Sequence, residues 1–242
     1  MARSLVTIVV PCFNEEETIP MLREVLERLL GQLSERYEVE FLFVDDGSRD
    51  RTRELLEKVA PALRGRVLLH ERNRGIAEAF RTGFQAARGE IVCTIDADCT
   101  FDPLALVPML ARLEQSGADI VAASPYHPDG GVEGVPAWRL VLSRGASWLY
   151  ARILPVKLYS YTACFRVYRR RAVERLEFRD PGFLGVAEML ISALLAGMTV
   201  VEYPLTLRRR VTGVSKMNTL RTVRHHARFM ARLMGRRLRG AL

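Results

Sequence analysis

The chain has 242 residues with a formal net charge of +8, and 49% of its residues are hydrophobic. This length and composition fit one domain with a sizeable core. No continuous apolar stretch is long enough to cross a bilayer, and the segment Leu5–Val10 is too short for the apolar region of a secretory signal. We therefore expect a cytoplasmic protein.

The amino-terminal half repeats a unit of apolar strand, polar loop and amphipathic helix. Strands are predicted at Leu5–Val10, Val39–Val44, Val67–His70 and Ile91–Ile95. Helices are predicted at Ile19–Leu33, through Leu55, Leu56 and Val59, and at Ala77–Ala87. Strands that alternate with helices of this length indicate an α/β fold with a mostly parallel sheet and right-handed crossovers. The loops that follow the strands then lie at one edge of the sheet.

The second predicted strand ends in two adjacent carboxylates, Asp45 and Asp46, and Asp50 follows in the same loop. Asp50 alone fits the N-cap of the next helix. One cap needs only one acceptor, and adjacent like charges are costly unless hydrogen-bond donors share them. The pair therefore favours a donor-rich ligand, such as a nucleoside base with its ribose.

The fourth predicted strand leads into Asp96 and Asp98, at the carboxyl edge where open α/β folds bind ligands. Two carboxylates this close repel each other unless a cation or donors share the site, and oxygen ligands favour Mg²⁺ or Mn²⁺ over zinc. Such pairs also form turns and caps, and Asp102-Pro103 begins a helix predicted over Leu104–Glu114. We expect a metal site for a phosphate-bearing substrate.

Four motifs occur in a defined order along the chain: Val9-Val10-Pro11-Cys12-Phe13-Asn14-Glu15-Glu16, Val44-Asp45-Asp46-Gly47-Ser48, Asn73-Arg74-Gly75 and Asp96-Ala97-Asp98. In this order they resemble the family 2 inverting glycosyltransferases with the GT-A fold, and the resemblance extends to about residue 218. It implies a catalytic domain over residues 1–216 with Mg²⁺ or Mn²⁺ at Asp96 and Asp98. It also implies that a nucleotide-sugar donor is held by Pro11, Phe13, Glu15, Val44, Asp46, Asn73 and Gly75.

Within that family the chain is most similar to the dolichol-phosphate and polyprenyl-phosphate mannosyltransferases, through Tyr126–Gly134 and Trp138–Ala146. Arg139 and Ser143 are four residues apart, so they share a face of a helix and can grip one phosphate together. The resemblance implies that this is the phosphate of a lipid acceptor. The alternative for Arg139 is that it is an isolated arginine on a solvated face of the helix. The alternative for Trp138 is that it is a core residue.

The chain departs from the pattern of this branch in three places. It has Ser124-Pro125-Tyr126 where Ser-Arg-Tyr is frequent, and Thr100 where a metal-facing glutamine is usual. Residues 160–164 replace an Asp-Pro-Thr-Ser-Gly run. These departures concern the acceptor more than the carboxylates of the donor site.

Phe165-Arg166, Glu188, Arg210 and Ser215-Lys216 resemble the remaining landmarks of the family. The resemblance implies that Arg210 and Lys216 contact the donor diphosphate. A basic pair on a glycine-containing loop suits a lid that closes on phosphate and excludes water. Glu188 fits a helix cap or a salt bridge as well as a catalytic role.

Residues 217–242 are predicted to form a basic amphipathic helix. Its arginines and its apolar residues each recur at spacings of three and four: Arg221, Arg224, Arg228, Arg232, Arg236, Arg237 and Arg239, with Met217, Leu220, Val223, Ala227, Met230, Met234 and Leu238. Such a helix suits docking on an anionic membrane surface. The alternative is an apolar stripe packed on the catalytic domain. Aromatic interleaving is missing from this stretch, so no nucleic-acid partner is expected.

The four cysteines, Cys12, Cys93, Cys99 and Cys164, form no CxxC motif. We expect reduced structural thiols, not disulfides or zinc ligands.

These patterns and the resemblance together predict transfer of a hexose, with mannose from GDP-mannose as the first expectation, to a polyprenyl or dolichyl phosphate. A phosphate monoester has a second pKa of about 6, so it is an anion at neutral pH and needs no general base. A sugar hydroxyl would need one, and Asp129, Glu133 and Glu188 stay open for that role. Two alternatives remain: a family 2 enzyme that builds a surface polysaccharide or glycolipid from a UDP-sugar, and a catalytically silent nucleotide-sugar-binding or scaffold protein. A lipid acceptor is also compatible with a separate membrane-protein partner.

Overall fold

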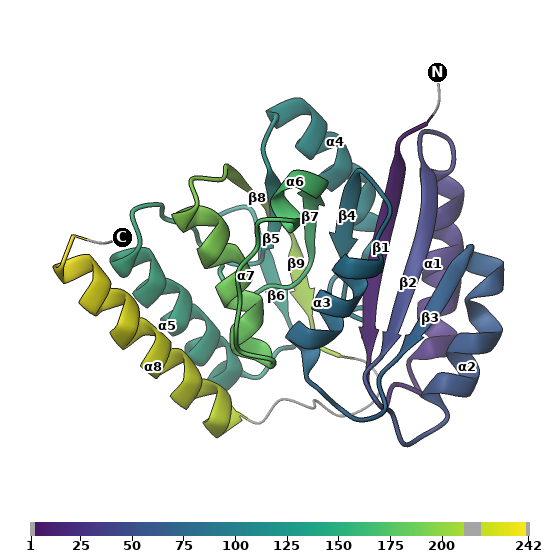
Figure 1. Cartoon of the computed structure of the whole chain (residues 1–242), viewed down its shortest axis with the longest axis horizontal. Coiled ribbons are helices and arrows are strands. Elements are labelled where there is room, and N and C mark those ends of the chain that lie inside the picture. Colours follow the sequence, from purple (N-terminus) through teal and green to yellow (C-terminus); the bar gives the residue numbers. More distant parts are fainter. Residues whose placement is uncertain (1–2, 211–218, 241–242) are drawn as a thin grey trace.

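The computed structural model describes residues 3–210 and 219–240 and shows a mostly parallel sheet with helices on both faces (Figure 1). Its strands are β1 (Leu5–Cys12), β2 (Glu38–Asp45), β3 (Gly65–Leu69), β4 (Ile91–Thr94), β5 (Ile120–Ser124), β6 (Gly131–Glu133), β7 (Arg166–Arg169), β8 (Val200–Pro204) and β9 (Thr206–Arg208). Its α-helices are α1 (Ile19–Leu33), α2 (Thr52–Val59), α3 (Ile76–Ala86), α4 (Leu106–Ser116), α5 (Ala137–Ile153), α6 (Arg170–Val173), α7 (Phe183–Leu195) and α8 (Thr219–Leu238). The 3₁₀ turns η1 and η2 span Pro61–Leu63 and Pro103–Ala105.

Within the described residues, the main sheet has seven strands in the order β3-β2-β1-β4-β7-β5-β8. All neighbours pair in parallel except β7, which runs antiparallel to both β4 and β5. A small second sheet pairs β6 with β9 in parallel. The predicted α/β fold with a mostly parallel sheet is confirmed.

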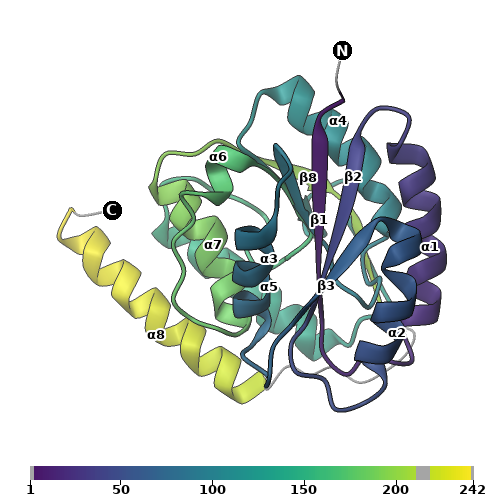
Figure 2. The same cartoon turned by 45° about the vertical axis from the view of Figure 1, so that its right-hand side comes forward.

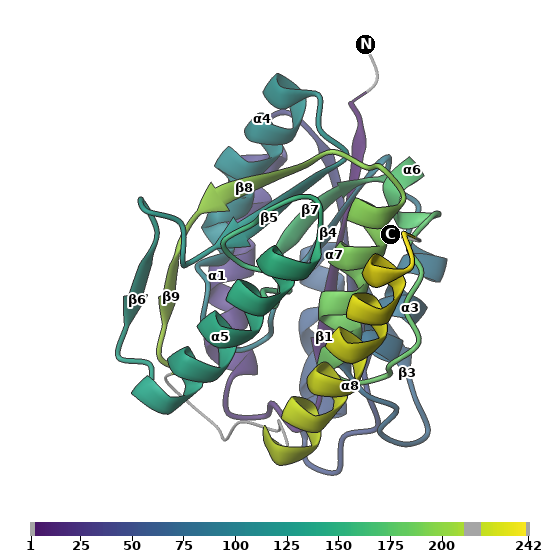
Figure 3. The ribbon, with the colours of Figure 1, turned by 90° about the vertical axis from the view of Figure 1, so that its left-hand side faces the viewer.

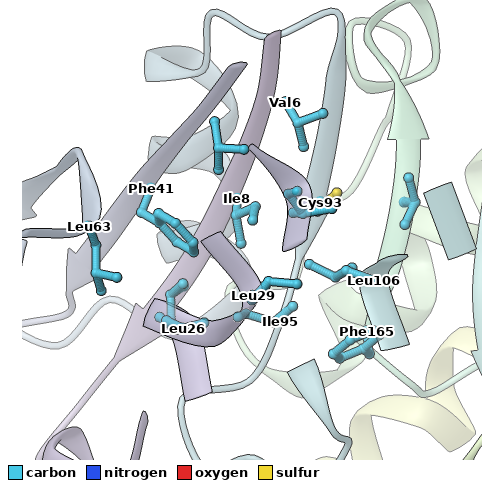
Figure 4. Packing of buried hydrophobic residues seen from close by; sticks show 14 of the residues in the cluster. Val6, Ile8, Leu26, Leu29, Phe41, Leu63, Cys93, Ile95, Leu106 and Phe165 are labelled. Atoms are coloured by element: carbon cyan, nitrogen blue, oxygen red, sulfur yellow. The ribbon is translucent and has the colours of Figure 1, made fainter. Parts of the chain in front are cut away.

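The strands are buried on both faces, so alternate residues feed two separate cores. Ile8 and Phe41 belong to the core beneath α1, α2 and α4, which Figure 4 shows in close-up. Val9 and Leu42, one residue further along each strand, belong to the core beneath α3, α5 and α7. Figure 2 shows α1 and α2 on one side of the strands β1 to β3 and α3 on the other.

The predicted elements agree with the observed ones to within a few residues. The helix Ile19–Leu33 has the predicted bounds, whereas β1 continues two residues past the prediction to Cys12. Asp102 caps η2 by accepting a hydrogen bond from the Leu104 amide at 3.0 Å, so α4 itself begins only at Leu106. The strands β1, β2 and β4 therefore deliver their following loops to one edge, as expected.

The helices α5 and α8 lie side by side at the end of the molecule away from β3 (Figures 1 and 3). The predicted carboxy-terminal helix is present, and most of its apolar stripe is exposed, which contradicts the alternative of a stripe packed on the catalytic domain. His226 and Leu233 are its buried residues, whereas Leu220 and Leu238 of the predicted apolar stripe are 82% and 81% exposed. The predicted division of the chain at residue 216 stays a prediction. Among the described residues, the apolar length that a bilayer span requires is not found in any helix.

Candidate active site

The loops that follow β1 and β2 are hydrogen-bonded to each other. The Asn14 amide donates to Ser48 Oγ at 2.9 Å, and the Glu15 amide donates to Thr52 Oγ1 at 2.7 Å. Asn14 takes a positive φ of 53°, a conformation that asparagine tolerates better than most residues. These bonds fix the backbone of residues 13–16 at the carboxyl end of the sheet.

Asp46 is held by donors of the protein itself. Its Oδ1 accepts from His70 Nδ1 at 2.6 Å and from the Arg74 amide at 2.8 Å. Its Oδ2 accepts from Asn73 Nδ2 at 2.9 Å and from the Gly75 amide at 2.8 Å. Because a carboxylate only accepts, His70 must carry its proton on Nδ1. The sequence analysis expects a bound base and ribose to donate to this carboxylate. In the structure, residues 70–75 supply four donors to Asp46, which therefore organises the wall of the site.

Two glycines allow backbone segments to meet at this wall. A Cβ on Gly47, which has φ +72°, would lie 2.4 Å from the Arg72 carbonyl carbon. A Cβ on Gly75, with φ +103°, would lie 2.4 Å from the Pro181 carbonyl oxygen. Both positions need the left-handed conformation and the missing side chain. The Asp46 loop is thereby packed onto the loop that follows β3, and that loop onto the turn that precedes α7.

The Asp96-Ala97-Asp98 motif follows β4 at the centre of the same edge. Burial and the neighbouring charge of Asp98 raise the pKa of Asp96 to about 7. The Cys164 thiol donates to Asp96 Oδ1, with Sγ 2.6 Å from the oxygen, and burial together with Asp96 raises the pKa of that thiol. Asp98 Oδ1 accepts from the Thr100 amide at 3.1 Å. The pair is thus a site whose negative charge is under-compensated by the protein.

Arg210 supplies the nearest cationic group. Its guanidinium forms an ion pair with Glu15 and lies 3.6 Å from Asp98, measured from Nη1 to Oδ2. Arg210 is distant in sequence from both carboxylates and reaches them through β9. The arrangement fits a residue that neutralises phosphate charge next to Asp98.

Two cavities meet at these carboxylates. The first, here called the donor cleft after the ligand that the sequence analysis predicts for its residues, measures about 450 Å³ and includes Pro11, Phe13, Glu15, Asp46, Asn73, Gly75 and Asp180 in its lining. The second, here called the acceptor groove because the predicted acceptor residues Arg139 and Ser143 line it, measures about 790 Å³ and lies along α5 and α8. Five residues line both cavities: Asp96, Asp98, Phe183, Arg210 and Thr222.

The acceptor groove is largely apolar with a polar patch near the carboxylates. Arg139 and Ser143 both line it from α5, one helical turn apart as predicted. Ser143 Oγ lies 2.8 Å from Thr162 Oγ1. The Arg139 Nε atom is buried and has no hydrogen-bond partner among the described residues. A buried guanidinium nitrogen without a partner points to an anionic ligand.

The structure brings together most of the predicted site residues. Every predicted donor-binding residue lines the donor cleft except Val44, which is fully buried in the core because its side chain faces α3. Lys216, Ser215 and the loop expected to act as a lid lie outside the described residues. The roles assigned to these residues stay predictions.

Several alternatives are decided by burial and contacts. Glu188 is buried and accepts from the amides of Arg179 and Asp180 at 2.7 and 2.8 Å, so it supports the turn before α7. Arg166 is also buried and donates to the Val186 and Tyr161 carbonyls, which is a structural role. Trp138 is 50% exposed beside the groove and is not a core residue. All four cysteines are free thiols, as predicted.

Three residues at the site were missed by sequence reasoning: His70, Asp180 and His225. His70 follows β3 at the sheet edge, so the rule that located Asp46 could have located it. Asp180 lies in an Asp-Pro-Gly turn, and His225 Nδ1 donates to its Oδ2 at 2.5 Å. The pairing of Asp180 with His225 has no signal in the sequence, because 45 residues separate the two.

The carboxylate ligands at this site suit a hard divalent cation whose remaining coordination positions are filled by the substrate and water. Among the described residues there is no cluster of three or more His, Cys, Asp or Glu side chains able to hold a metal alone. Mg²⁺ is characteristically bound by one or two carboxylates together with substrate phosphates and water. Asp96 and Asp98 would supply the protein ligands, and a bound cation would offset the repulsion between their charges.

The fold matches solved structures over nearly the whole chain. Glucosyl-3-phosphoglycerate synthase from Mycobacterium tuberculosis, solved with Mn²⁺, UDP and glucosyl-3-phosphoglycerate, superposes with a TM-score of 0.70 and 20% identity, covering 96% of this chain and 80% of that one. The same enzyme with Mg²⁺ and UDP gives a TM-score of 0.68 and 21% identity, covering 94% and 79%. The chain has the GT-A, Rossmann-like fold of glycosyltransferases.

Sequence comparison then identifies the family. The model of glycosyl transferase family 2 matches residues 7–177, and the chain belongs to that family. Polyprenol monophosphomannose synthase from Mycolicibacterium smegmatis is 32% identical over 219 residues, covering 87% of this chain and 80% of that protein. Dolichol-phosphate mannosyltransferase from Pyrococcus furiosus is 30% identical over 231 residues, covering 95% of this chain and 63% of that protein. The protein is a glycosyltransferase.

Proposed function

We propose that the enzyme transfers mannose from GDP-mannose to a polyprenyl or dolichyl phosphate, with inversion and with Mg²⁺ or Mn²⁺ at Asp96 and Asp98. One observation carries this proposal: the two carboxylates lie where a cleft lined by several charged and polar side chains meets a larger, mostly apolar groove. A nucleoside diphosphate suits the first cavity and a lipid phosphate suits the second. The names of the relatives from M. smegmatis and P. furiosus agree with this choice of donor sugar and acceptor.

On the donor side, Asp46 holds Asn73 and Gly75 in place, and Pro11, Phe13 and Glu15 also line the cleft. These groups suit the base and ribose of a nucleotide. Arg210 lies beside Asp98, where it would neutralise the diphosphate. A bound Mg²⁺ or Mn²⁺ would add Lewis-acid stabilisation of the leaving nucleoside diphosphate.

On the acceptor side, Arg139 and Ser143 would orient a phosphate monoester toward Asp98 for in-line attack on the anomeric carbon. The second pKa of such a monoester is about 6, so the attacking oxygen is already anionic at neutral pH. A dedicated general base is then unnecessary. This agrees with the observation that Glu188 is occupied by two backbone amides and lines neither cavity.

The helices that border the groove suit a lipid surface. Large apolar side chains are exposed on α5 (Trp138, Val141, Leu142, Trp148 and Leu149) and on α8 (Leu220, Val223, Met234 and Leu238). Neither helix contains an acidic residue in its sequence. Exposed apolar residues combined with arginines favour an anionic membrane interface. Flotation with anionic liposomes tests this, because V141E combined with L220E should abolish co-flotation, and unchanged flotation would refute the membrane proposal.

The direct test is a transfer assay with Mn²⁺ or Mg²⁺, a short-chain polyprenyl phosphate, and GDP-mannose or UDP-glucose in parallel. We expect label from GDP-mannose in the lipid product. Label from UDP-glucose alone would replace the donor assignment with that of the UDP-sugar enzymes. Hydrolysis of the sugar donor without a lipid product would overturn the assignment of polyprenyl phosphate as the acceptor.

A further inference from the structure

The helix α8 is attached to the rest of the molecule through two consecutive histidines with different partners. His225 Nδ1 donates to Asp180 Oδ2 at 2.5 Å, in the turn before α7. His226 Nδ1 lies 2.8 Å from the Tyr150 hydroxyl on α5. His226 and Leu233 are the buried residues among the described side chains of α8, so most of the helix is exposed. Further along the helix, Phe229, Met230 and Leu233 pack on the core, and Arg237 donates to the Ile153 carbonyl at 3.0 Å. The two histidines are thus contacts that hold its first turns, next to the two cavities.

The partner of His225 is itself held firmly. Asp180 Oδ1 accepts from the Gly182 amide at 2.8 Å, and the Asp180 amide donates to the buried Glu188 at 2.8 Å. The Pro181 carbonyl accepts from the Ala77 amide at 2.9 Å, which ties the same turn to α3. This turn lines the donor cleft beside Gly75. His225 thus anchors α8 to a fixed part of the donor site.

The partner of His226 belongs to the other cavity. Tyr150 is fully buried on α5, and its ring packs against those of Tyr161 and His226. His226 lines the acceptor groove, whereas His225 lines the donor cleft. One helical turn earlier, Thr222 lines both. The first turns of α8 therefore form a wall between the two cavities, with one histidine facing each side.

We propose that His225 and His226 are positioning residues for transfer: together they clamp the first turns of α8 so that the donor cleft and the acceptor groove stay aligned at Asp98. This inference rests on the proposed function of the two cavities. His225 acts through Asp180 and His226 through Tyr150, and neither is assigned a proton-transfer role.

The test compares H225A and H226A with H225N and H226N in two assays. Asparagine places an amide near the position of Nδ1, so it can keep the bond to Asp180 or Tyr150 without titrating. A231Q, at an exposed position of α8 that lines neither cavity, is the matched control. Transfer is measured with detergent-dispersed short-chain polyprenyl phosphate, so that binding of the enzyme to a membrane does not affect the measured rate.

We expect H225A and H226A each to lower kcat/KM for both substrates by about tenfold, the effect of losing one well-formed hydrogen bond at a part-buried (His225) or buried (His226) position. The asparagine variants should recover most of this loss, and A231Q should behave as the wild type. An H225N variant as inactive as H225A would overturn the clamp and favour imidazole chemistry at this position.

Hydrogen exchange of the α8 amides provides the second assay, and it needs no substrate. Exchange in residues 219–226 should be faster in both alanine variants than in A231Q, and unchanged exchange would overturn the clamp. If the wild type binds no nucleoside diphosphate, the proposed function fails while the exchange data still decide whether the clamp exists. If the wild type transfers sugar and all variants match it in both assays, the clamp alone fails.

Discussion

The donor cleft is enclosed by loops that are hydrogen-bonded to one another, whereas the acceptor groove lies between two helices that expose large apolar side chains. Asp46 alone accepts four hydrogen bonds, from His70, Asn73, Arg74 and Gly75. On the acceptor side, the Arg139 Nε atom is buried without a partner among the described residues. The donor cleft is thus preorganised for a defined polar ligand, and the groove is left incomplete for an anion with an apolar tail.

The largest effect is expected from a substitution of Asp98, where the donor cleft and the acceptor groove meet. D98N should lower transfer by about a thousandfold or more, because it weakens both the cation site and the contact with Arg210. The thermal unfolding midpoint should change little, since Asp98 is partly exposed.

The matched control for D98N is D102N, in the same loop, where asparagine can still cap η2. Steady-state transfer rates and calorimetric unfolding compare the two variants. A D98N protein that unfolds would indicate a structural role for the carboxylate and contradict the account.

A smaller effect should separate the two regions. R139A is expected to raise KM for the lipid phosphate by about 10- to 100-fold, the loss of a charge-assisted hydrogen bond, while KM for the donor stays unchanged. R152A is the control, because Arg152 is on the same helix, stacks on Trp148 at 4.4 Å and lines neither cavity. A parallel rise in both KM values would show that the groove is not specific to the acceptor.

The converse change is made in the donor wall. D46N replaces one accepting oxygen with an NH₂ group that faces donors, so we expect about 2 kcal/mol lower stability and roughly a tenfold higher KM for the donor. D45N should cost less, because among the described residues the Asp45 carboxylate accepts one hydrogen bond, from the Ser48 amide at 3.0 Å. Urea unfolding and donor titration would measure both, and equal effects would contradict the assigned role of Asp46.

Much of this organisation could be predicted from the sequence, because strand periodicity and the positions of carboxylates after strands are local signals. Asp96, Asp98 and Asp46 are located in this way. Arg139 and Ser143 are indicated by the resemblance to the family, and their helical spacing places them on one face. The pairing of Asp46 with His70, Asn73 and Gly75 could not be predicted, since these residues lie 24 to 29 positions away in the sequence.

The buried face of α8 was also not predictable. The sequence shows an apolar stripe through Val223 and Met234, but the buried residues of α8 are His226 and Leu233. His226 lies 2.8 Å from the Tyr150 hydroxyl, and Leu233 packs in the core together with the partly buried Phe229 and Met230. The orientation of α8, which borders the acceptor groove, is fixed by contacts between residues that are distant in the sequence, and a local pattern does not reveal it.

The smallest expected effect concerns pH and is absent at neutrality. Burial lowers the pKa of His226 to about 4 from an ordinary value of 6.5; Asp180 raises it and His225 lowers it further. The unfolded chain therefore binds a proton first, so stability is fully present above pH 6.5 and falls as the pH decreases toward 4. We expect a loss on the order of 1–3 kcal/mol across this window in the wild type.

H226N removes this titrating group while keeping a polar contact to Tyr150. Its free energy of unfolding, measured by urea titration between pH 4 and pH 7, should fall less steeply than that of the wild type. An identical pH dependence in the two proteins would show that His226 is not the group responsible.

The central claim is that the donor cleft and the acceptor groove meet at one cation held by Asp96 and Asp98. Phosphorus NMR relaxation tests it most directly, with Mn²⁺, GDP and a short-chain polyprenyl phosphate bound together. The account predicts strong paramagnetic relaxation of both the diphosphate and the lipid phosphate signals in the wild type, and loss of both in D98N. Relaxation of the diphosphate alone, with the lipid phosphate bound but unaffected, would contradict it.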